Sequence, residues 1–312
     1  MTTIDLSTPA TEPLGLLDGL PRRVTLTLPE LQLVARAAGD APLPFDVATP
    51  TTATALDDRL GVTPAATDAA AYSAALAALH DPADSLTRRG LMTQGQVDRA
   101  LVGAVGLLAT PRLALDVDLA IGGAQAKAWH RQGGEAVASL ATADGLVFEL
   151  AWFPASAWAE ELARVAALPS DLTVGTSAVP AHVILPVALA TAGADAVRTG
   201  RHDLLPVLVA QHPGARDADG SPLEADDLTA ALAALAAETR GRLRAMATDA
   251  GSSDPDRSSR RPVGVVAWLL VDDGWRAVRP VTGGGIDLLE LVTVAPLDLA
   301  VELAPVLAAV TA

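Results

Sequence analysis

The sequence predicts an α+β fold of two similar halves that share an antiparallel sheet. Gly122-Gly123, Gly133-Gly134 and Asp144-Gly145 separate runs of alternating apolar residues at hairpin spacing. The order helix, antiparallel strands, helix then occurs a second time along the chain. Parallel winding would need a helix between successive strands, and the tight turns exclude that arrangement.

A repeat in the sequence supports the two halves. Residues 148–168 align with residues 289–309 at an offset of 141, and eight of the 21 positions are identical. The matching residues are Glu149, Leu150, Ala159, Glu161, Leu162, Ala163, Val165 and Ala167 with Glu290, Leu291, Ala300, Glu302, Leu303, Ala304, Val306 and Ala308. We therefore expect a pseudo-twofold duplicated fold, with a flexible lead-in at 1–20 and halves at 21–170 and 171–312 in one domain.

The first half begins with a short strand at 24–27. Thr27 and Glu30 form a capping-box pattern that starts a helix, and Gly39 ends it. The remaining predictions for this half are helices at 66–80, 94–110 and 155–168, and four strands within 112–153.

The second half begins where residues 183–186 lead into a helix, followed by an apolar run at 204–209. One long helix is predicted at 223–248, carrying Leu228, Leu232, Leu235, Leu243 and Met246. Residues 249–261 are rich in Gly, Ser, Asp and Arg and are expected to be mobile. Strands at 263–271, 275–281 and 286–294 precede a closing helix at 297–310.

Composition argues against several classes of partner. The 312 residues include 37 acidic and 22 basic side chains, a net charge of −15, which disfavours nucleic acid and anionic bilayers. Cysteine is absent, which removes disulfides and thiolate ligands. The first 20 residues lack a secretory signal pattern and no apolar run suits a bilayer, so a soluble cytoplasmic protein is expected.

No catalytic or cofactor motif stands out. The five histidines show no metal-ligand spacing, and Gly283-Gly284-Gly285 lacks the helix and the Lys-Ser/Thr of a phosphate-binding loop. Asp116 and Asp118 lie on one face of a strand, where solvated charges explain them better than catalysis. The sequence therefore predicts no enzyme activity, no metal and no cofactor.

The strand at 262–271 is apolar on both faces, although an antiparallel strand normally has one wet face. Either helices cover both faces, which is the favoured alternative, or one face meets a partner. Trp268, Trp275 and Val278 would then be anchors for a partner. Leu204, Leu228, Leu232 and Leu235 lie on helices that could form a groove for a helical ligand, although core packing explains them better.

The chain resembles the EspG family of cytosolic chaperones of type VII (ESX) secretion in actinobacteria. Four segments carry the resemblance: Leu26-Thr27-Leu28-Pro29-Glu30-Leu31, Arg89-Gly90-Leu91, Leu107-Leu108-Ala109-Thr110-Pro111 and Val292-Thr293-Val294-Ala295-Pro296. The resemblance implies a central antiparallel sheet flanked by two helical bundles. It further implies binding of a helical PE–PPE-like heterodimer, whose apolar tip meets the sheet and the C-terminal bundle.

We therefore expect a non-enzymatic chaperone that masks the apolar tip of its cargo and keeps it soluble for export. Two alternatives stay open. One is a ligand-binding protein or enzyme that uses a cleft between the halves, and the other is a self-associating homodimer. The free chain is expected to be a monomer or a homodimer.

Overall fold

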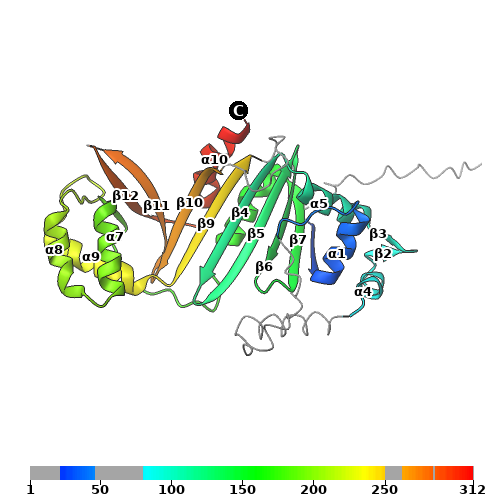
Figure 1. Cartoon of the computed structure of the whole chain (residues 1–312), viewed down its shortest axis with the longest axis horizontal. Helices are drawn as coiled ribbons and strands as arrows, with labels where there is room; N and C mark the ends of the chain where they lie inside the picture. Colours follow the sequence, from blue (N-terminus) through cyan, green and yellow to red (C-terminus); the bar gives the residue numbers. More distant parts are fainter. Residues whose placement is uncertain (1–21, 46–79, 250–261, 284, 312) are drawn as a thin grey trace, which may run out of the picture. The chain divides into compact units, whose positions relative to one another are not determined.

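The computed structural model describes residues 22–45, 80–249, 262–283 and 285–311 (Figure 1). The predictions made for residues 1–20, 66–79 and 250–261 fall outside this described part of the chain.

One large antiparallel sheet dominates the described residues. Its ten strands follow the order β1-β7-β6-β5-β4-β9-β10-β11-β12-β8, which confirms the predicted α+β class. The strands are β1 (Arg22–Thr27), β4 (Leu113–Ile121), β5 (Ala124–Gly133), β6 (Ala136–Thr142), β7 (Val147–Pro154), β8 (His182–Pro186), β9 (Gly241–Asp249), β10 (Pro262–Val271), β11 (Gly274–Gly283) and β12 (Ile286–Val294). The helices are α1 (Leu28–Ala37), α4 (Pro82–Arg88), α5 (Arg99–Ala109), α6 (Trp158–Ala166), α7 (Val187–Arg198), α8 (Leu205–Gln211), α9 (Ala225–Glu238) and α10 (Asp298–Thr311).

The order of elements repeats along the chain. In each half an edge strand runs directly into a helix, a four-strand meander follows, and a last helix closes the half. The register repeats as well, because Thr27 pairs with Val147 and Pro186 pairs with Leu288, each just before its helix begins. Val147 and Leu288 differ by 141 positions, the offset of the sequence repeat.

The chain divides into two compact units. In the described residues, the first comprises 22–45, 80–111, 131–140 and 145–155, and the second comprises the remainder. In the first unit Thr27 caps α1 through the predicted capping box, in which its N–H donates to Glu30 Oε2 at 2.8 Å. Arg89 donates from Nη1 to both oxygens of Glu30 at 3.1 Å, which ties the end of α4 to the start of α1.

The predicted start of the helix at Gln94 is wrong. Gln94 and Gly95, at φ 51° and 76°, turn a short hairpin between β2 (Met92–Thr93) and β3 (Gln96–Val97). These positive φ values cannot continue a helix. Helix α5 begins after Asp98, whose side chain accepts from Ala100 N–H at 2.9 Å.

The predicted long helix at 223–248 is also wrong. Helix α9 ends at Glu238, and residues 241–249 form β9, one of the two central strands in the sheet order. Leu243, Ala245 and Ala247 are buried while Arg242 and Arg244 are exposed. This is the period of two expected of a strand, so the second half has four meander strands rather than three.

Candidate protein-binding surface

On one face of the sheet in the second unit, side-chain exposure increases along a single row of residues that pair across neighbouring strands. The register places these residues side by side on that face: Val183, Leu291, Val278, Ala267, Arg244 and Asp118. Val183 and Leu291 are 1% exposed, Val278 and Ala267 are half-buried, and Arg244 and Asp118 are exposed. Other elements therefore cover this face only as far as β10, and the same face of β9 and β4 is open to solvent.

The cover is the helical bundle α7–α9, which lies against the β8 end of the sheet (Figure 1). Five of the residues predicted to bind a partner meet in its core cluster: Leu204, Leu228, Leu232, Leu235 and Val278. Leu228 and Leu232 are 3% and 4% exposed and pack inside the cluster. Leu204, Leu235 and Val278 are half-buried at its margin, so only these three offer part of their surface to a ligand.

The other two predicted anchors lie on the opposite face of the sheet. Trp268 and Trp275 are 0% and 1% exposed, with ring centroids 6.0 Å apart. Trp268 Nε1 donates to Glu302 Oε2 on α10, and Trp275 Nε1 donates to Ala166 O at the end of α6, each at 2.9 Å. Both rings are core residues in this structure, which accounts for the apolar character of one face of β10.

A chain of polar contacts runs beside these tryptophans. Arg279 donates to Glu302 Oε1 at 2.6 Å and to Glu290 Oε2 at 3.3 Å, and His182 Nε2 lies 2.8 Å from Glu290 Oε1. The hydrogen bonds to Glu302 are the largest cause that raises the pKa of Arg279 above its ordinary value. The charge of Glu302 and the contacts with Glu290 act in the same direction, whereas partial burial lowers the pKa. Arg279 therefore stays charged and holds α10 to β11 and β12.

The open part of the face combines apolar and cationic side chains on neighbouring strands. Val265 is 46% exposed and pairs with the half-buried Met246. The next pairs on this face are Ala267 with Arg244 and Leu269 with Arg242, and both arginines are exposed. We call the face formed by Val265, Ala267, Leu269, Arg242 and Arg244 the open strip.

The aspartates singled out in the sequence lie on this face, opposite Met246 and Arg244. The side chain of Asp118 is 60% exposed and lies 3.9 Å from Lys127 Nζ. A solvated position on a strand therefore accounts for Asp118. Asp118, Lys127, Arg242 and Arg244 also line a shallow polar depression of about 370 Å³ next to the open strip.

A second, more apolar groove lies at one end of the bundle. It has a volume of about 630 Å³ and is lined by Pro186, Val187, Ala188, Gln211, His212, Pro213, Ile286 and Asp287. Val187 and Ile286 are 37% and 47% exposed there. None of the residues predicted from the sequence to bind a partner lines this groove.

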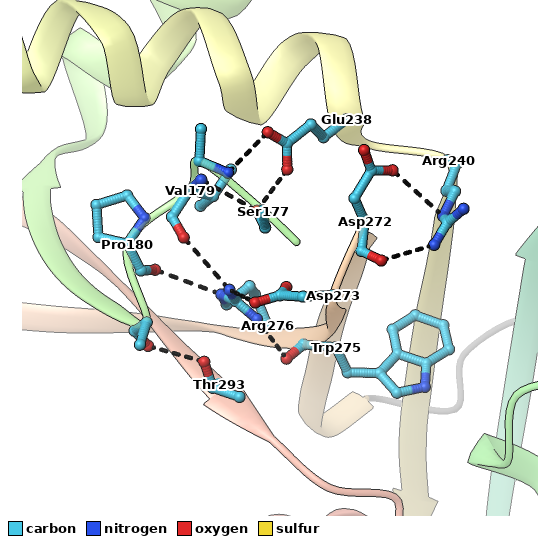
Figure 2. Close-up of polar contacts among 12 residues, drawn as sticks. Ser177, Val179, Pro180, Glu238, Arg240, Asp272, Asp273, Trp275, Arg276 and Thr293 are labelled. Carbon is cyan, nitrogen blue, oxygen red and sulfur yellow. Dashed lines mark hydrogen bonds and ion pairs between the residues drawn. The ribbon is translucent and has the colours of Figure 1, made fainter. Parts of the chain in front are cut away.

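A buried arginine fixes the segment that joins α6 to β8 (Figure 2). Arg276, 1% exposed, donates to Val179 O and Pro180 O at 3.3 and 3.4 Å and to Asp273 Oδ2 at 2.9 Å. Glu238, at the end of α9, accepts from Ser177 Oγ and from the N–H of Ala178. These contacts hold the segment against α9 and the β10–β11 hairpin. They therefore fix the position of α9, and with it the bundle, next to the open strip.

The described residues contain no group of three or more His, Asp or Glu that could hold a metal ion. Among the helices of the described residues, none combines the length and the hydrophobicity that a membrane span requires.

The sequence matches no protein-family model and no curated protein. The fold does match a solved structure, that of the Mycobacterium tuberculosis type VII secretion system chaperone EspG5 in complex with a PE25–PPE41 dimer. The match has a TM-score of 0.59 and 12% sequence identity, and covers 92% of this chain and 96% of the other. The predicted resemblance to the EspG family is therefore confirmed at the level of the fold.

Proposed function

We propose that this chain is a non-enzymatic cytosolic chaperone of type VII secretion that binds the apolar tip of a PE–PPE-like heterodimer. The observation that carries the proposal is the match of almost the whole chain to a structure whose EspG5 component is a secretion chaperone bound to such a dimer. The match extends over 92% of this chain and 96% of the other, so it is not confined to one part of the fold.

The open strip and the adjoining margin of the bundle form the proposed docking surface. Val265 and the half-buried Leu235 and Val278 supply apolar contact area. Burying such surface stabilises a complex by about 25 cal/mol per Å², and it removes from water the cargo surface that would otherwise aggregate. The net charge of −15 would keep the complex soluble after the apolar surfaces are covered.

Of the seven residues predicted from the sequence to contact the partner, Leu204, Leu235 and Val278 are the ones proposed to reach it directly. Leu228 and Leu232 support the bundle from within, and Trp268 and Trp275 support the sheet from its other face. Their proposed roles are therefore in positioning the docking surface.

Co-expression tests the proposal. The chain would be produced with each PE–PPE-like pair encoded in the same genome, and the lysates analysed by affinity capture followed by size-exclusion chromatography. A soluble complex of the chain with one pair, together with loss of soluble cargo when the chain is omitted, is the expected outcome. A chain that elutes alone in every co-expression, with cargo solubility unchanged, would refute the chaperone function. A stable homodimer in place of a complex would favour self-association.

A further inference from the structure

The most informative feature of the open strip is its charge. Arg242 and Arg244 are exposed side chains of a protein with a net charge of −15. Within the described residues, neither guanidinium has a carboxylate within the 4.0 Å of an ion pair, whereas nearby Lys127 lies 3.9 Å from Asp118. Two exposed arginine side chains on β9 therefore lie beside the apolar residues of β10.

The register between β9 and β10 determines which apolar residue lies beside each arginine. Arg244 lies directly opposite Ala267, and Arg242 lies opposite Leu269. Side chains that face each other across antiparallel strands have Cβ atoms about 5 Å apart, so each arginine stem can rest along the apolar strand while its guanidinium points to water. A ligand that covers β10 therefore meets both guanidinium groups along one edge.

The spacing of the two arginines selects a type of ligand. Residues two apart on a strand are separated by about 6.6 Å. Residues four apart on a helix rise by about 6 Å and share one face. Two carboxylates one helical turn apart could therefore each meet one guanidinium, with the bidentate geometry that favours arginine.

We propose that the cargo element that docks here is a helical tip whose apolar side chains cover Val265 and Leu269, and whose Asp or Glu residues at i and i+4 pair with Arg242 and Arg244. This proposal rests on the function proposed above and specifies the chemistry of the partner. It makes the arginine pair the selective part of the site, because a tip with lysines in place of the acidic residues would be repelled. The apolar contact supplies affinity for any tip of suitable shape.

The test compares two double variants that change the net charge equally. R242E/R244E reverses the pair on β9, and R36E/R88E reverses two arginines on α1 and α4. Binding of the purified cognate PE–PPE-like heterodimer would be measured by calorimetry at low and high salt, with thermal unfolding as the check on folding. We expect R242E/R244E to bind about tenfold or more weakly at low salt and R36E/R88E to bind like the unaltered chain. For the unaltered chain, high salt should weaken binding. In R242E/R244E high salt should instead strengthen the residual binding, because it screens the repulsion between the introduced glutamates and the acidic pair of the cargo.

The outcomes separate this inference from the proposed function. If the unaltered chain binds no such heterodimer, the proposed function fails and this inference fails with it. If the unaltered chain binds but the two double variants bind equally well, only the inference is overturned. A cargo variant in which the acidic pair is replaced by lysines should bind R242E/R244E better than it binds the unaltered chain. The opposite preference would also overturn the inference.

Discussion

Trp268 and Glu302 join β10 to α10 through a hydrogen bond of 2.9 Å from the indole nitrogen to the carboxylate. Trp268 is fully buried, and the other carboxylate oxygen of Glu302 accepts from Arg279. The contact therefore holds the last helix to the sheet on the face that is turned away from the open strip. The two residues belong to the scaffold, and variants of them should be read as changes in stability.

Trp268→Phe should lower the free energy of unfolding by about 1–3 kcal/mol, because it keeps most of the apolar ring but leaves Glu302 without one donor. Urea denaturation measures the loss. Glu302→Ala is the matched variant, and the double variant should lose less than the sum of the two, since both single changes break the same bond. Strict additivity would show that the bond contributes nothing. Trp268→Asp should unfold the chain, because it places a charge in a fully buried position.

The pH dependence of stability should report on Glu30, which is 2% exposed. Burial alone would raise its pKa, but the hydrogen bonds from Thr27 and Ser85 and the charge of Arg89 together hold the pKa below its ordinary value. A carboxyl group with a lowered pKa stabilises the fold above its ordinary pKa of 4.5, and this contribution is lost as the pH falls through the folded-state value.

Glu30→Gln should therefore be less stable than the unaltered chain near neutral pH, and the difference should shrink below about pH 4. Glutamine can still accept from the Thr27 N–H, so the loss reflects the charge rather than the cap. Denaturation curves across the acid range measure it. An equal gap at neutral and acidic pH would show that Glu30 acts only through packing.

Gly264 on β10 packs closely against Val306 on α10. A Cβ atom at this position would lie 2.6 Å from Val306 Cγ1 and 3.2 Å from Val306 Cβ. Valine is branched at Cβ and cannot rotate away freely, so Gly264→Ala should cost about 1–3 kcal/mol. Val306→Ala removes the clashing methyl groups, and the double variant should regain part of the loss of Gly264→Ala. No rescue in the thermal unfolding of the double variant would mean that the glycine is needed for another reason.

The sequence predicted helices and strands correctly where a turn or cap signal and the alternation of apolar residues indicate the same element. Gly122-Gly123 and Asp144-Gly145 separate β4 from β5 and β6 from β7, and the Thr27 cap begins α1 as expected. The prediction failed at residues 239–248, because Leu235, Leu243 and Met246 also fit a helical period and no glycine or proline stands before Gly241. The strand is established by its pairing with β4 and β10.

The candidate surface was harder to predict, because it depends on which face of β10 is covered. The residues of this strand are apolar on both sides, and the sequence could not show that α10 buries Trp268 while Val265 stays exposed. Arg242 and Arg244 were missed because the predicted helix ran through them, although their alternation with Leu243 and Ala245 was a usable signal. Arg276 is buried because it donates to Val179 and Pro180, in a segment about 100 residues away in the sequence. No local sequence pattern predicts this burial.

The place where the cargo docks can be settled by two substitutions of exposed residues. Val265, 46% exposed, lies on the open strip, and Ile286, 47% exposed, lies in the apolar groove at the end of the bundle. Because neither side chain is in the core, Val265→Asp and Ile286→Asp should both fold with nearly unchanged thermal stability. On the proposed docking surface the cargo would bury the new carboxylate against apolar side chains, which costs several kcal/mol, so Val265→Asp should weaken cargo binding by about tenfold or more while Ile286→Asp binds normally. Calorimetry with the cognate heterodimer measures both. Loss of binding by Ile286→Asp alone would move the docking site to the groove lined by Val187 and Pro213, and would leave the open strip without a role in cargo recognition.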